Sequence, residues 1–451
     1  MPTLITPISG WGRYPVQTCE LQRPERYADL RSGTASLIAR GQGRSYGDAA
    51  LNENGRVLLT ERINRLLYLD LKSGTLRAEA GVTLAEILKV IVPQGWFLPV
   101  TPGTKFVSLG GCVAADVHGK NHHHEGSFSE YVLAIELILA DGSRVMCSPE
   151  KNPQLFWATT GGMGLTGIIG EVTLQLVPIA SAYMKVRHYV AADLKQLFEH
   201  LQNPDMDDRY TVAWIDSLAS GKSLGRGIAM CGHHAAAHEL PADFGGAFTI
   251  KSEPSRSVPF DLPAWTLNPL SIGVFNALYY RHEGKKQQPF LSGYDPYFYP
   301  LDAISHWNRL YGKRGFVQYQ CVIPDATAFD GINTLLQELS ASRRPSFLAV
   351  LKRLGEQGRG MLSFPLAGYT LALDLPIRDA GLFALLNKLD EIVLQHGGRV
   401  YLAKDARLSA DSFRAMYPRH EEWRKIKNEI DAGNYFNSSM ARRLQITGNA
   451  T

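Results

Sequence analysis

The chain has 451 residues, which exceeds the roughly 250–300 residues at which a single hydrophobic core stops growing, so two domains are expected rather than one. Apolar residues make up 45% and charged residues 20%, a composition that excludes a disordered chain, a collagen and a coiled coil. The net charge of +4 is spread along the chain, which argues against nucleic acid as the main partner.

No apolar run reaches the ~18 residues that a membrane-spanning helix needs. The N-terminal sequence MPTLITPISGWGRYP lacks the basic and apolar regions of a signal peptide. The five cysteines form no CxxC pair, which is typical of free thiols in a reducing compartment. These features predict a cytoplasmic protein without a signal peptide or transmembrane helix, and they leave peripheral membrane attachment open.

Residues 36–180 have the pattern of an α+β fold with short strands separated by turns. Apolar spacing and a capping box, with Thr83 as N-cap and Glu86 three residues later, predict a helix over 83–92. Asp141-Gly142 predicts a hairpin between strands 131–140 and 143–147. The other expected elements are strands over 36–40, 56–60, 66–71, 75–80 and 168–177, and a helix over 153–159.

A second style of sequence begins near Tyr183. Residues 218–300 are rich in Pro, Gly, Ser and His and show little periodicity, which predicts surface loops. Strands over 315–323, 346–352 and 368–376, with helices over 325–339 and 381–396, indicate an antiparallel sheet covered by helices. From Arg399 the pattern predicts one strand, RVYLAKDAR, followed by two helices.

Two glycine clusters compete for the role of a phosphate-binding loop. Gly162–Gly167 fits G-x-G-x-x-G, but an expected helix precedes it and a strand follows, the reverse of the dinucleotide-binding order, so a spacer role is favoured. Gly41–Asp48 follows a strand, and its small residues can present several backbone N–H groups to an anion. Pro102–Thr104 and Ser108–Gly111 support it, because Ser108 is expected to cap a short helix whose N-terminus adds to phosphate binding.

Polar side chains recur among apolar ones further along the chain. Three adjacent histidines, His122–His124, lack a carboxylate or cysteine at ligand spacing, so no metal site is predicted. Lys404, in the expected last strand, shares a face with a leucine, which allows partial burial and easier deprotonation, but this spacing by itself favours a surface lysine. Lys352 is placed likewise, and Gln318 and Gln320 share one strand face, so these strands are expected to line a pocket with a polar floor.

The most distinctive blocks are ARGQGRSYGD, PGTKFVSLGGCVAADVHGKNHHHEGSF, LFWATTGGMGLTGII, GFVQYQCVIP, YLAKDAR and the closing MYPR…SSMARRL. Together, from about Gly10 to Leu444, they resemble the decaprenylphosphoryl-β-D-ribose 2′-oxidase family, flavoproteins of the vanillyl-alcohol-oxidase type. The resemblance implies an α+β fold of the PCMH type with two domains. An FAD-binding domain would comprise residues 1–182 and 399–451, and a substrate domain built on an antiparallel sheet would comprise 183–398.

The resemblance also implies roles for individual residues. Lys404 matches the lysine required for turnover, as the base or as an anchor for the substrate hydroxyl, with His118 and Tyr401 as orienting groups near the flavin. The flavin-binding positions are Ala39, Arg40, Gly41, Gln42, Gly43, Arg44, Ser45, Tyr46, Gly47, Asp48, Ala49, Gly103, Ser108, Leu109, Gly110, Gly111, Ala115, Asp116, Val117, His118, Ile169 and Tyr401. The substrate-binding candidates are Lys120, Gln318, Gln320 and Lys352, of which the two lysines suit a phosphate. Ala372 stands where the best-known members carry a cysteine facing the pocket.

The activity implied by the resemblance is FAD-dependent oxidation of the 2′-hydroxyl of a polyprenyl-phosphate ribose to the 2′-keto sugar. An NAD(P)H-dependent short-chain reductase would be the partner that completes epimerisation to the arabinose donor for cell-wall arabinan. FAD is expected to be held non-covalently, because Arg44 stands where covalent relatives carry the linking histidine. Residues 255–300 are candidates for peripheral membrane contact. Two alternatives are a sugar-lactone or alditol oxidase with a soluble substrate and O₂, and a non-catalytic binding protein of the same fold.

Overall fold

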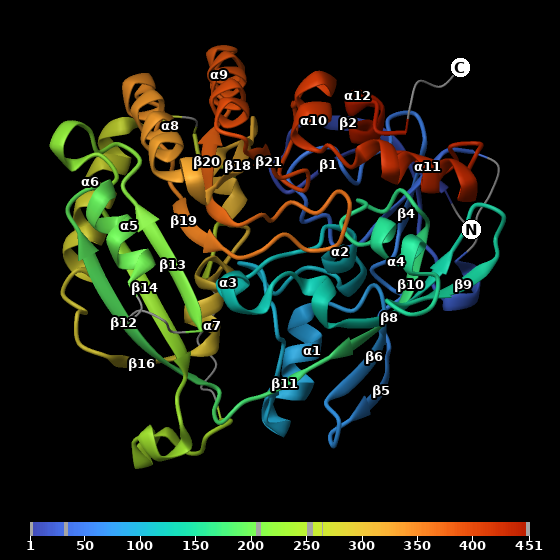
Figure 1. The fold of residues 1–451 in the computed structure, drawn as a ribbon, viewed down its shortest axis with the longest axis horizontal. Coiled ribbons are helices and arrows are strands. Elements are labelled where there is room, and N and C mark those ends of the chain that lie inside the picture. The colour runs from blue at the N-terminus through green and yellow to red at the C-terminus, as the bar shows by residue number, and fades with distance from the viewer. Residues whose placement is uncertain (1–2, 31–34, 204–208, 250–255, 264, 448–451) are drawn as a thin grey trace.

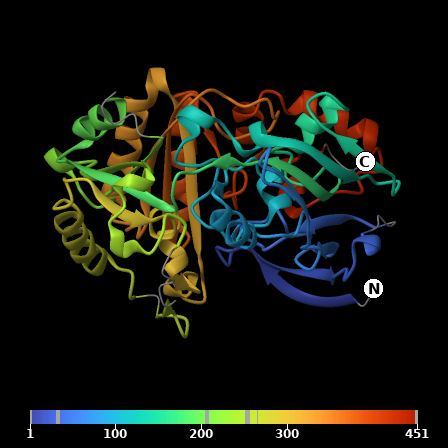
Figure 2. The same ribbon diagram turned by 90° about the horizontal axis from the view of Figure 1, so that it is seen from below.

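The computed structural model describes residues 3–30, 35–203, 209–249, 256–263 and 265–447. Two small sheets and the last helices of the chain form one side of the molecule, and an eight-stranded sheet with its covering helices forms the other (Figures 1 and 2). Within the described ranges no helix is both long and apolar enough to cross a membrane.

The N-terminal side is built on a four-stranded and a five-stranded sheet, ordered β1-β2-β4-β3 and β5-β6-β10-β8-β9. In the first sheet β2 and β3 both pair in parallel with β4, while the second sheet is antiparallel throughout. The strands are β1 (Thr3–Ser9), β2 (Val16–Gln22), β3 (Leu37–Arg40), β4 (Arg56–Leu59), β5 (Leu66–Asp70), β6 (Thr75–Glu79), β8 (Val132–Ile138), β9 (Arg144–Cys147) and β10 (Ile168–Gln175). A short pair, β7 (Trp96–Phe97) and β11 (Val177–Pro178), leads out of this side.

The eight-stranded sheet has the order β16-β12-β14-β13-β19-β20-β18-β21, with antiparallel pairing. Its strands are β12 (Tyr183–Ala191), β13 (Tyr210–Ile215), β14 (Gly227–His234), β16 (Phe290–Gly293), β18 (Phe316–Pro324), β19 (Ala349–Leu354), β20 (Gly368–Pro376) and β21 (Arg399–Val400). A separate parallel pair joins β15 (Arg256–Ser257) to β17 (Ile304–Ser305).

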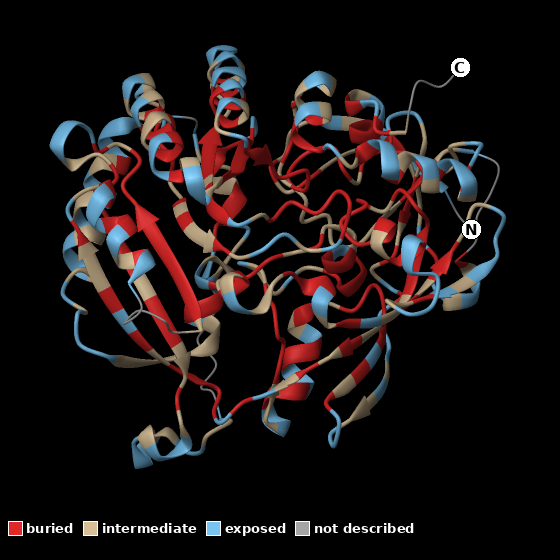
Figure 3. Cartoon of the chain, viewed as in Figure 1, coloured by how far each residue is buried: buried red, intermediate tan, exposed pale blue. Residues whose placement is uncertain are grey.

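One face of the large sheet is covered by α5, α8 and α9, whose inward sides are buried against it (Figure 3). The helices are α1 (Leu84–Ile91), α2 (Leu109–Ala114), α3 (His122–Glu125), α4 (Pro153–Thr159), α5 (Leu194–Gln202), α6 (Pro269–Glu283), α7 (Tyr294–Phe298), α8 (Ala328–Ser342), α9 (Gly381–Gln395), α10 (Ala410–Met416), α11 (His420–Ile430) and α12 (Ser439–Leu444). The chain end returns to the N-terminal side, where Trp423 Nε1 donates a hydrogen bond to the Ala158 carbonyl at 2.8 Å.

Strong local signals predicted the elements well. The capping box of α1 is present, with Glu86 N donating to Thr83 Oγ1 at 3.2 Å and Thr83 N donating to Glu86 Oε2 at 2.8 Å. The hairpin at Asp141-Gly142 joins β8 to β9, and α4 has the predicted bounds. The three strands predicted in the second half are β18, β19 and β20, which lie together in one sheet.

Three predictions of secondary structure were wrong. Two helices were expected after the strand at Arg399, whereas the structure has α10, α11 and α12 there. Residues 218–300 are not simply surface loops, because they contain β14, the 15-residue helix α6, β16 and α7. Helix α6 begins at a cap that composition obscured, Asn268 followed by Pro269 at the first helical position. The expected strand RVYLAKDAR ends at Val400; residues 401–404 form a turn in which Lys404 N donates to the Tyr401 carbonyl at 2.9 Å.

Candidate functional site

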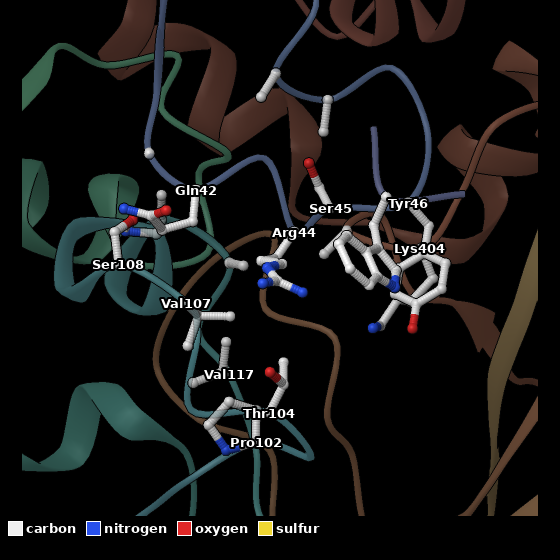
Figure 4. Close-up of a pocket in the computed structure, with 18 of the residues that line it drawn as sticks. Gln42, Arg44, Ser45, Tyr46, Pro102, Thr104, Val107, Ser108, Val117 and Lys404 are labelled. Carbon is white, nitrogen blue, oxygen red and sulfur yellow. Dashed lines mark hydrogen bonds between the residues drawn. The ribbon is translucent and has the colours of Figure 1, made fainter. Parts of the chain in front are cut away.

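A cavity lies between the two sides of the molecule. Its walls come from the loop after β3, the segment before and including α2, the uncovered face of β18–β20 and the turn at 401–404. In the close-up view, Gln42 and Ser108 lie on one side of the cavity, Arg44 lies at its centre, and Tyr46 with Lys404 lies on the other (Figure 4). The tertiary structure therefore brings together most of the residues predicted from the sequence.

The loop after β3 presents backbone N–H groups to the cavity. Within the described part of the chain, the amides of Gly41 to Ser45 have no hydrogen-bond acceptor, and all five residues line the cavity. Gly43 has φ +60°, a left-handed conformation that glycine adopts without strain. Consecutive free amides of this kind form a nest for an anion, so the loop fits a pyrophosphate.

The C-terminal end of the phosphate-binding loop is anchored by buried ion pairs. Arg443 of α12 binds Asp48 at 2.7 Å and Asp405 at 2.9 Å. In addition, Tyr46 N donates to the Ala403 carbonyl at 3.0 Å. The C-terminal helix thus fixes the phosphate-binding loop and the turn of Lys404 relative to each other.

The segment Ser108–Gly111 contributes to the site differently from the prediction. Ser108 does cap α2, accepting from Gly111 N at 3.3 Å. However, the amides of Leu109 and Gly110 donate to the carbonyls of Val82 and Ala80, so the protein itself uses the first amides of this short helix. The small residues of this segment line the cavity and allow close approach of a ligand. The N-terminus of α2, however, has few free amides left to bind a phosphate.

The Gly162–Gly167 cluster follows α4 and precedes β10, which confirms the inverted order that argued against a dinucleotide-binding loop. Its glycines nevertheless reach the site, because Gly164 and Gly167 line the cavity together with Met163. Gly162 lies outside the cavity, and a Cβ there would stand 2.1 Å from the Ala158 carbonyl oxygen. This glycine serves the packing of α4, as a spacer does.

His118 faces the cavity from the segment after α2. Gln320 Nε2 lies 2.9 Å from His118 Nε2 and 3.2 Å from Thr370 Oγ1, so the amide donates and the Nε2 atom accepts. The proton of the neutral ring then sits on Nδ1, which is buried and has no partner among the described residues. Burial and the nearby Lys352 hold the pKa of His118 well below its usual value. A neutral ring with one unpaired N–H is the result.

Lys404 is buried, although it lies in a turn and not in a strand. Its Nζ stands 4.0 Å from the centre of the Tyr46 ring (Figure 4). Burial lowers the pKa of Lys404 to about 7, opposed by the negative charge of Asp374 and assisted by the positive charge of Lys352. Burial therefore makes this amine easier to deprotonate than an ordinary lysine, so it is suited to accept a proton.

Asp374 of β20 was missed in the sequence. It is fully buried behind the cavity wall, where its carboxylate accepts hydrogen bonds from Gln318 Nε2 and, at 3.5 Å, from the Tyr311 hydroxyl. Burial raises the pKa of Asp374 to about 7, against the opposing effects of Gln318 and Lys404. The signal that could have identified it is a single charged residue inside the apolar run LALDLP. Charged side chains are rarely buried without a partner, so such a residue indicates a polar interaction inside the protein.

Lys352 also points into the cavity, from β19. Residues opposite each other on antiparallel strands share a face, and Lys352 pairs with Thr370 while Val350 pairs with Ala372. The ammonium has no hydrogen bond to any described residue, and burial lowers its pKa to about 8. The predicted polar floor is confirmed, because Lys352, Gln318 and Gln320 all line the cavity.

Some predicted residues lie outside the cavity. Lys120 points away from the cavity, toward α7. Its Nζ donates a hydrogen bond to the Tyr297 carbonyl and lies 4.2 Å from the centre of the Tyr297 ring. Asp116 is buried and accepts hydrogen bonds from Ser363 Oγ and Ser129 N. The other predicted positions that do not line the cavity are Arg40, Gly47, Asp48 and Leu109. Those that line it are Ala39, Gly41, Gln42, Gly43, Arg44, Ser45, Tyr46, Ala49, Gly103, Ser108, Gly110, Gly111, Ala115, Val117, His118, Ile169, Gln318, Gln320, Lys352, Tyr401 and Lys404.

The cavity also contains residues that no sequence pattern indicated. Trp11, Leu301, Trp307 and Leu348 give one part of its wall an apolar character. Among the described residues, no three His, Cys, Asp or Glu side chains are arranged to hold a metal ion.

Comparison with known proteins places this geometry in a family. Residues 14–148 match the model of an FAD binding domain. The decaprenylphosphoryl-beta-D-ribose oxidase of Mycolicibacterium smegmatis is 35% identical over 99% of this chain and 98% of its own. A putative D-arabinono-1,4-lactone oxidase of Neurospora crassa is 29% identical over 37% of this chain and 29% of its own. The human Delta(24)-sterol reductase is 33% identical over 27% of this chain and 23% of its own.

The residues present fit FAD. The free amides of Gly41 to Ser45 suit its pyrophosphate, and the unpaired Nδ1 of His118 gives the buried end of the cavity a hydrogen-bond donor. Both features lie within the matched FAD-binding region. Since a relative of 35% identity covers almost the whole length of both chains, this protein belongs to the decaprenylphosphoryl-β-D-ribose oxidase family of FAD-dependent oxidoreductases acting on CH–OH groups.

Proposed function

We propose that the protein oxidises the 2′-hydroxyl of decaprenylphosphoryl-β-D-ribose, or of a closely related polyprenyl-phosphate ribose, to the 2′-keto sugar. The observation that carries this proposal is the pair of buried lysines on the cavity wall. Lys404 is poised to accept a proton, and Lys352 offers an unpaired ammonium to a phosphate. The apolar wall that contains Trp11, Leu301 and Trp307 suits the start of a polyprenyl chain.

Each residue has a defined part in the proposed reaction. Bound FAD supplies an acceptor for the hydride that leaves the carbinol carbon. The unprotonated Nζ of Lys404 takes the hydroxyl proton, so that the C–H and O–H bonds are lost and the carbonyl forms. His118, fixed by Gln320, donates from Nδ1 to an acceptor in the cavity, and Tyr401 is held by its hydroxyl donating to the Ala115 carbonyl at 2.9 Å. Lys352 holds the substrate phosphate by charge.

The proposal assigns the two sides of the molecule to two domains. Residues 1–182 and 399–451 form the FAD-binding domain, and residues 183–398 form the substrate domain. The ion pairs of Arg443 with Asp48 and Asp405, which tie the chain end to the FAD loop, support this division. A 2′-keto product is an electrophile that must be reduced to give the epimer, so we infer an NAD(P)H-dependent reductase as the partner of the next step.

FAD is expected to be released from the denatured protein, because Arg44 stands where covalent relatives carry the linking histidine. The guanidinium of Arg44 is not a nucleophile, and it lies 3.9 Å from the centre of the Trp11 ring. Among the described residues, the histidine that lines the cavity is His118, and its Nε2 accepts a hydrogen bond from Gln320. Acid precipitation should leave the yellow colour in the supernatant; flavin that stays with the pellet would contradict non-covalent binding.

Asp374 is expected to set the pH dependence through Lys404. The base must be unprotonated, so the rate of flavin reduction rises with pH, with a midpoint below the ordinary pKa of a lysine because burial lowers the pKa of Lys404. The carboxylate of Asp374 raises that pKa, whereas Lys352 lowers it, and the neutral Tyr46 and His118 complete its surroundings. Asp374→Asn should therefore shift the midpoint to lower pH in stopped-flow measurements.

The control for this shift is Asp390→Asn, which changes a buried carboxylate that binds Arg407 outside the cavity. Its midpoint should stay at the wild-type pH. Equal midpoints for wild type and Asp374→Asn would leave Asp374 with a structural role only.

The proposed function is tested by anaerobic reduction of the purified holoenzyme. Decaprenylphosphoryl ribose should bleach the flavin absorbance, whereas free pentoses, sugar lactones and alditols should not. Turnover of soluble sugars with release of peroxide would instead support a lactone or alditol oxidase, although the similarity to such an enzyme covers only 37% of this chain. A purified chain without flavin absorbance would support a binding protein.

A further inference from the structure

Helix α6 carries an apolar outer surface that no described residue covers. Leu270, Val274 and Leu278, spaced by four residues along one side of the helix, are 78%, 54% and 62% exposed. Just before the helix, Trp265 is 74% exposed. Exposed apolar side chains are unremarkable singly, but a contiguous row on one helix marks an interaction surface.

The opposite side of α6 holds the helix in place. Ile272 and Asn276 are buried, and Asn276 Nδ2 donates to Asp216 Oδ1 at 2.6 Å. The Tyr279 ring packs on Trp214 of β13 with centroids 4.8 Å apart. The exposed row therefore belongs to a firmly seated helix at the outer edge of the molecule (left in Figure 1).

The exposed charged residues of the segment that contains α6 have one sign. Between Trp265 and Lys286 the only acidic residue is Glu283, whose side chain is 13% exposed and pairs with Lys286 at 2.9 Å. The exposed charged residues of this segment are Arg281 and Lys285, one turn apart at the C-terminal end of α6. An exposed apolar row with basic residues at one end supplies both the apolar area and the positive charge that favour binding at the interface of an anionic membrane.

The surface lies beside the cavity. Trp214, which supports α6, is paired with Val350 of β19, so α6 covers the same face of the sheet that lines the cavity. At its other end, Leu267 and Ile272 share a hydrophobic cluster with Trp307, which lines the apolar part of the cavity wall. A membrane that contacts α6 would thus lie close to the apolar part of the cavity wall.

We propose that α6 docks the protein on an anionic lipid bilayer, with Trp265, Leu270, Val274 and Leu278 entering the interface and Arg281 and Lys285 contacting lipid phosphates. This docking gives a polyprenyl-phosphate substrate a short path from the bilayer into the cavity. That consequence rests on the proposed function, whereas the affinity of the surface for lipid does not.

The test uses the FAD-loaded full chain and lipid vesicles without substrate. The wild-type protein should sediment with vesicles of phosphatidylglycerol and phosphatidylethanolamine and only weakly with pure phosphatidylcholine. Leu270→Gln/Leu278→Gln should lower the bound fraction by about tenfold or more, because polar side chains lose the transfer of apolar area into the interface. Arg281→Gln/Lys285→Gln should weaken binding to the anionic vesicles and reduce its salt dependence.

The matched control is Leu4→Gln/Ile5→Gln, which changes two apolar residues on β1 that are 62% and 71% exposed but lie apart from α6. It should bind vesicles like the wild type, and flavin absorbance should confirm that every variant is folded. Absent vesicle binding by the wild type, or equal losses in the two leucine variants, would overturn the proposal. Self-association in lipid-free solution that the α6 variant abolishes, without vesicle binding, would instead assign the surface to a second copy of the chain.

The outcome is separable from that of the proposed function. If the protein binds anionic vesicles through α6 but its flavin is not reduced by decaprenylphosphoryl ribose, the docking proposal is supported and the proposed substrate is contradicted. If the flavin is reduced by this substrate in detergent but the protein does not bind vesicles, the proposed activity is supported and the docking proposal is contradicted.

Discussion

Lys404→Ala is expected to retain FAD and to lose substrate-dependent flavin reduction by about 100-fold or more, the usual scale for removal of a general base. The reason is positional as well as chemical. Lys404 is a buried amine on the cavity wall whose pKa is lowered to about 7, so it can take a proton near neutral pH. It also lies outside the loop of free amides that fits the pyrophosphate, and its loss should leave the cofactor bound. Anaerobic stopped-flow mixing with substrate measures the effect.

The control compares two lysines on the same cavity wall. Lys352→Met removes the ammonium assigned to the substrate phosphate, so it should raise the substrate concentration needed for half-maximal reduction more than it lowers the maximal rate. Lys404→Met keeps the bulk of the side chain and should be as slow as Lys404→Ala. A Lys404 variant that reduces its flavin at nearly the wild-type rate would remove this residue from the mechanism.

Gly43→Val is expected to give a protein without FAD. Gly43 has φ +60°, and a Cβ on it would stand 2.2 Å from the Arg40 guanidinium. A branched side chain is strained in this conformation, and it would turn or obstruct the free amides on either side. Loss of the flavin spectrum after purification, with far-ultraviolet circular dichroism unchanged, is the expected measurement.

Gly221→Val separates backbone strain from loss of the phosphate site. Gly221 has nearly the same conformation, φ +59°, but lies outside the cavity, and no other atom lies within 4 Å of its added Cβ. It should therefore retain FAD despite a similar strain. If Gly43→Val retained FAD and Gly162→Ala lost it, the pyrophosphate site would have to be assigned to Gly162–Gly167 instead.

Local signals in the sequence were sufficient where a few neighbouring residues determine the structure. The capping box at Thr83, the Asp141-Gly142 hairpin and the Ser108 cap all appear as predicted, because each depends on hydrogen bonds within three or four residues. The resemblance of the distinctive sequence blocks also identified the family and most of the cavity wall. Helix α6 was missed because the composition of a long window concealed one good cap and a helix that is apolar on both sides.

Tertiary structure alone decided how the site works. From sequence, Lys404 was a strand residue beside a leucine; in the fold it is in a turn, and its pKa depends on Asp374 and Lys352, which come from two strands of the large sheet. The fold also withdrew Lys120 from the cavity, since its ammonium binds the Tyr297 carbonyl. Capping and turn formation are set by adjacent residues, and the sequence by itself determined them. Burial and charge pairing depend on which distant segments meet, and only the packed chain determines that.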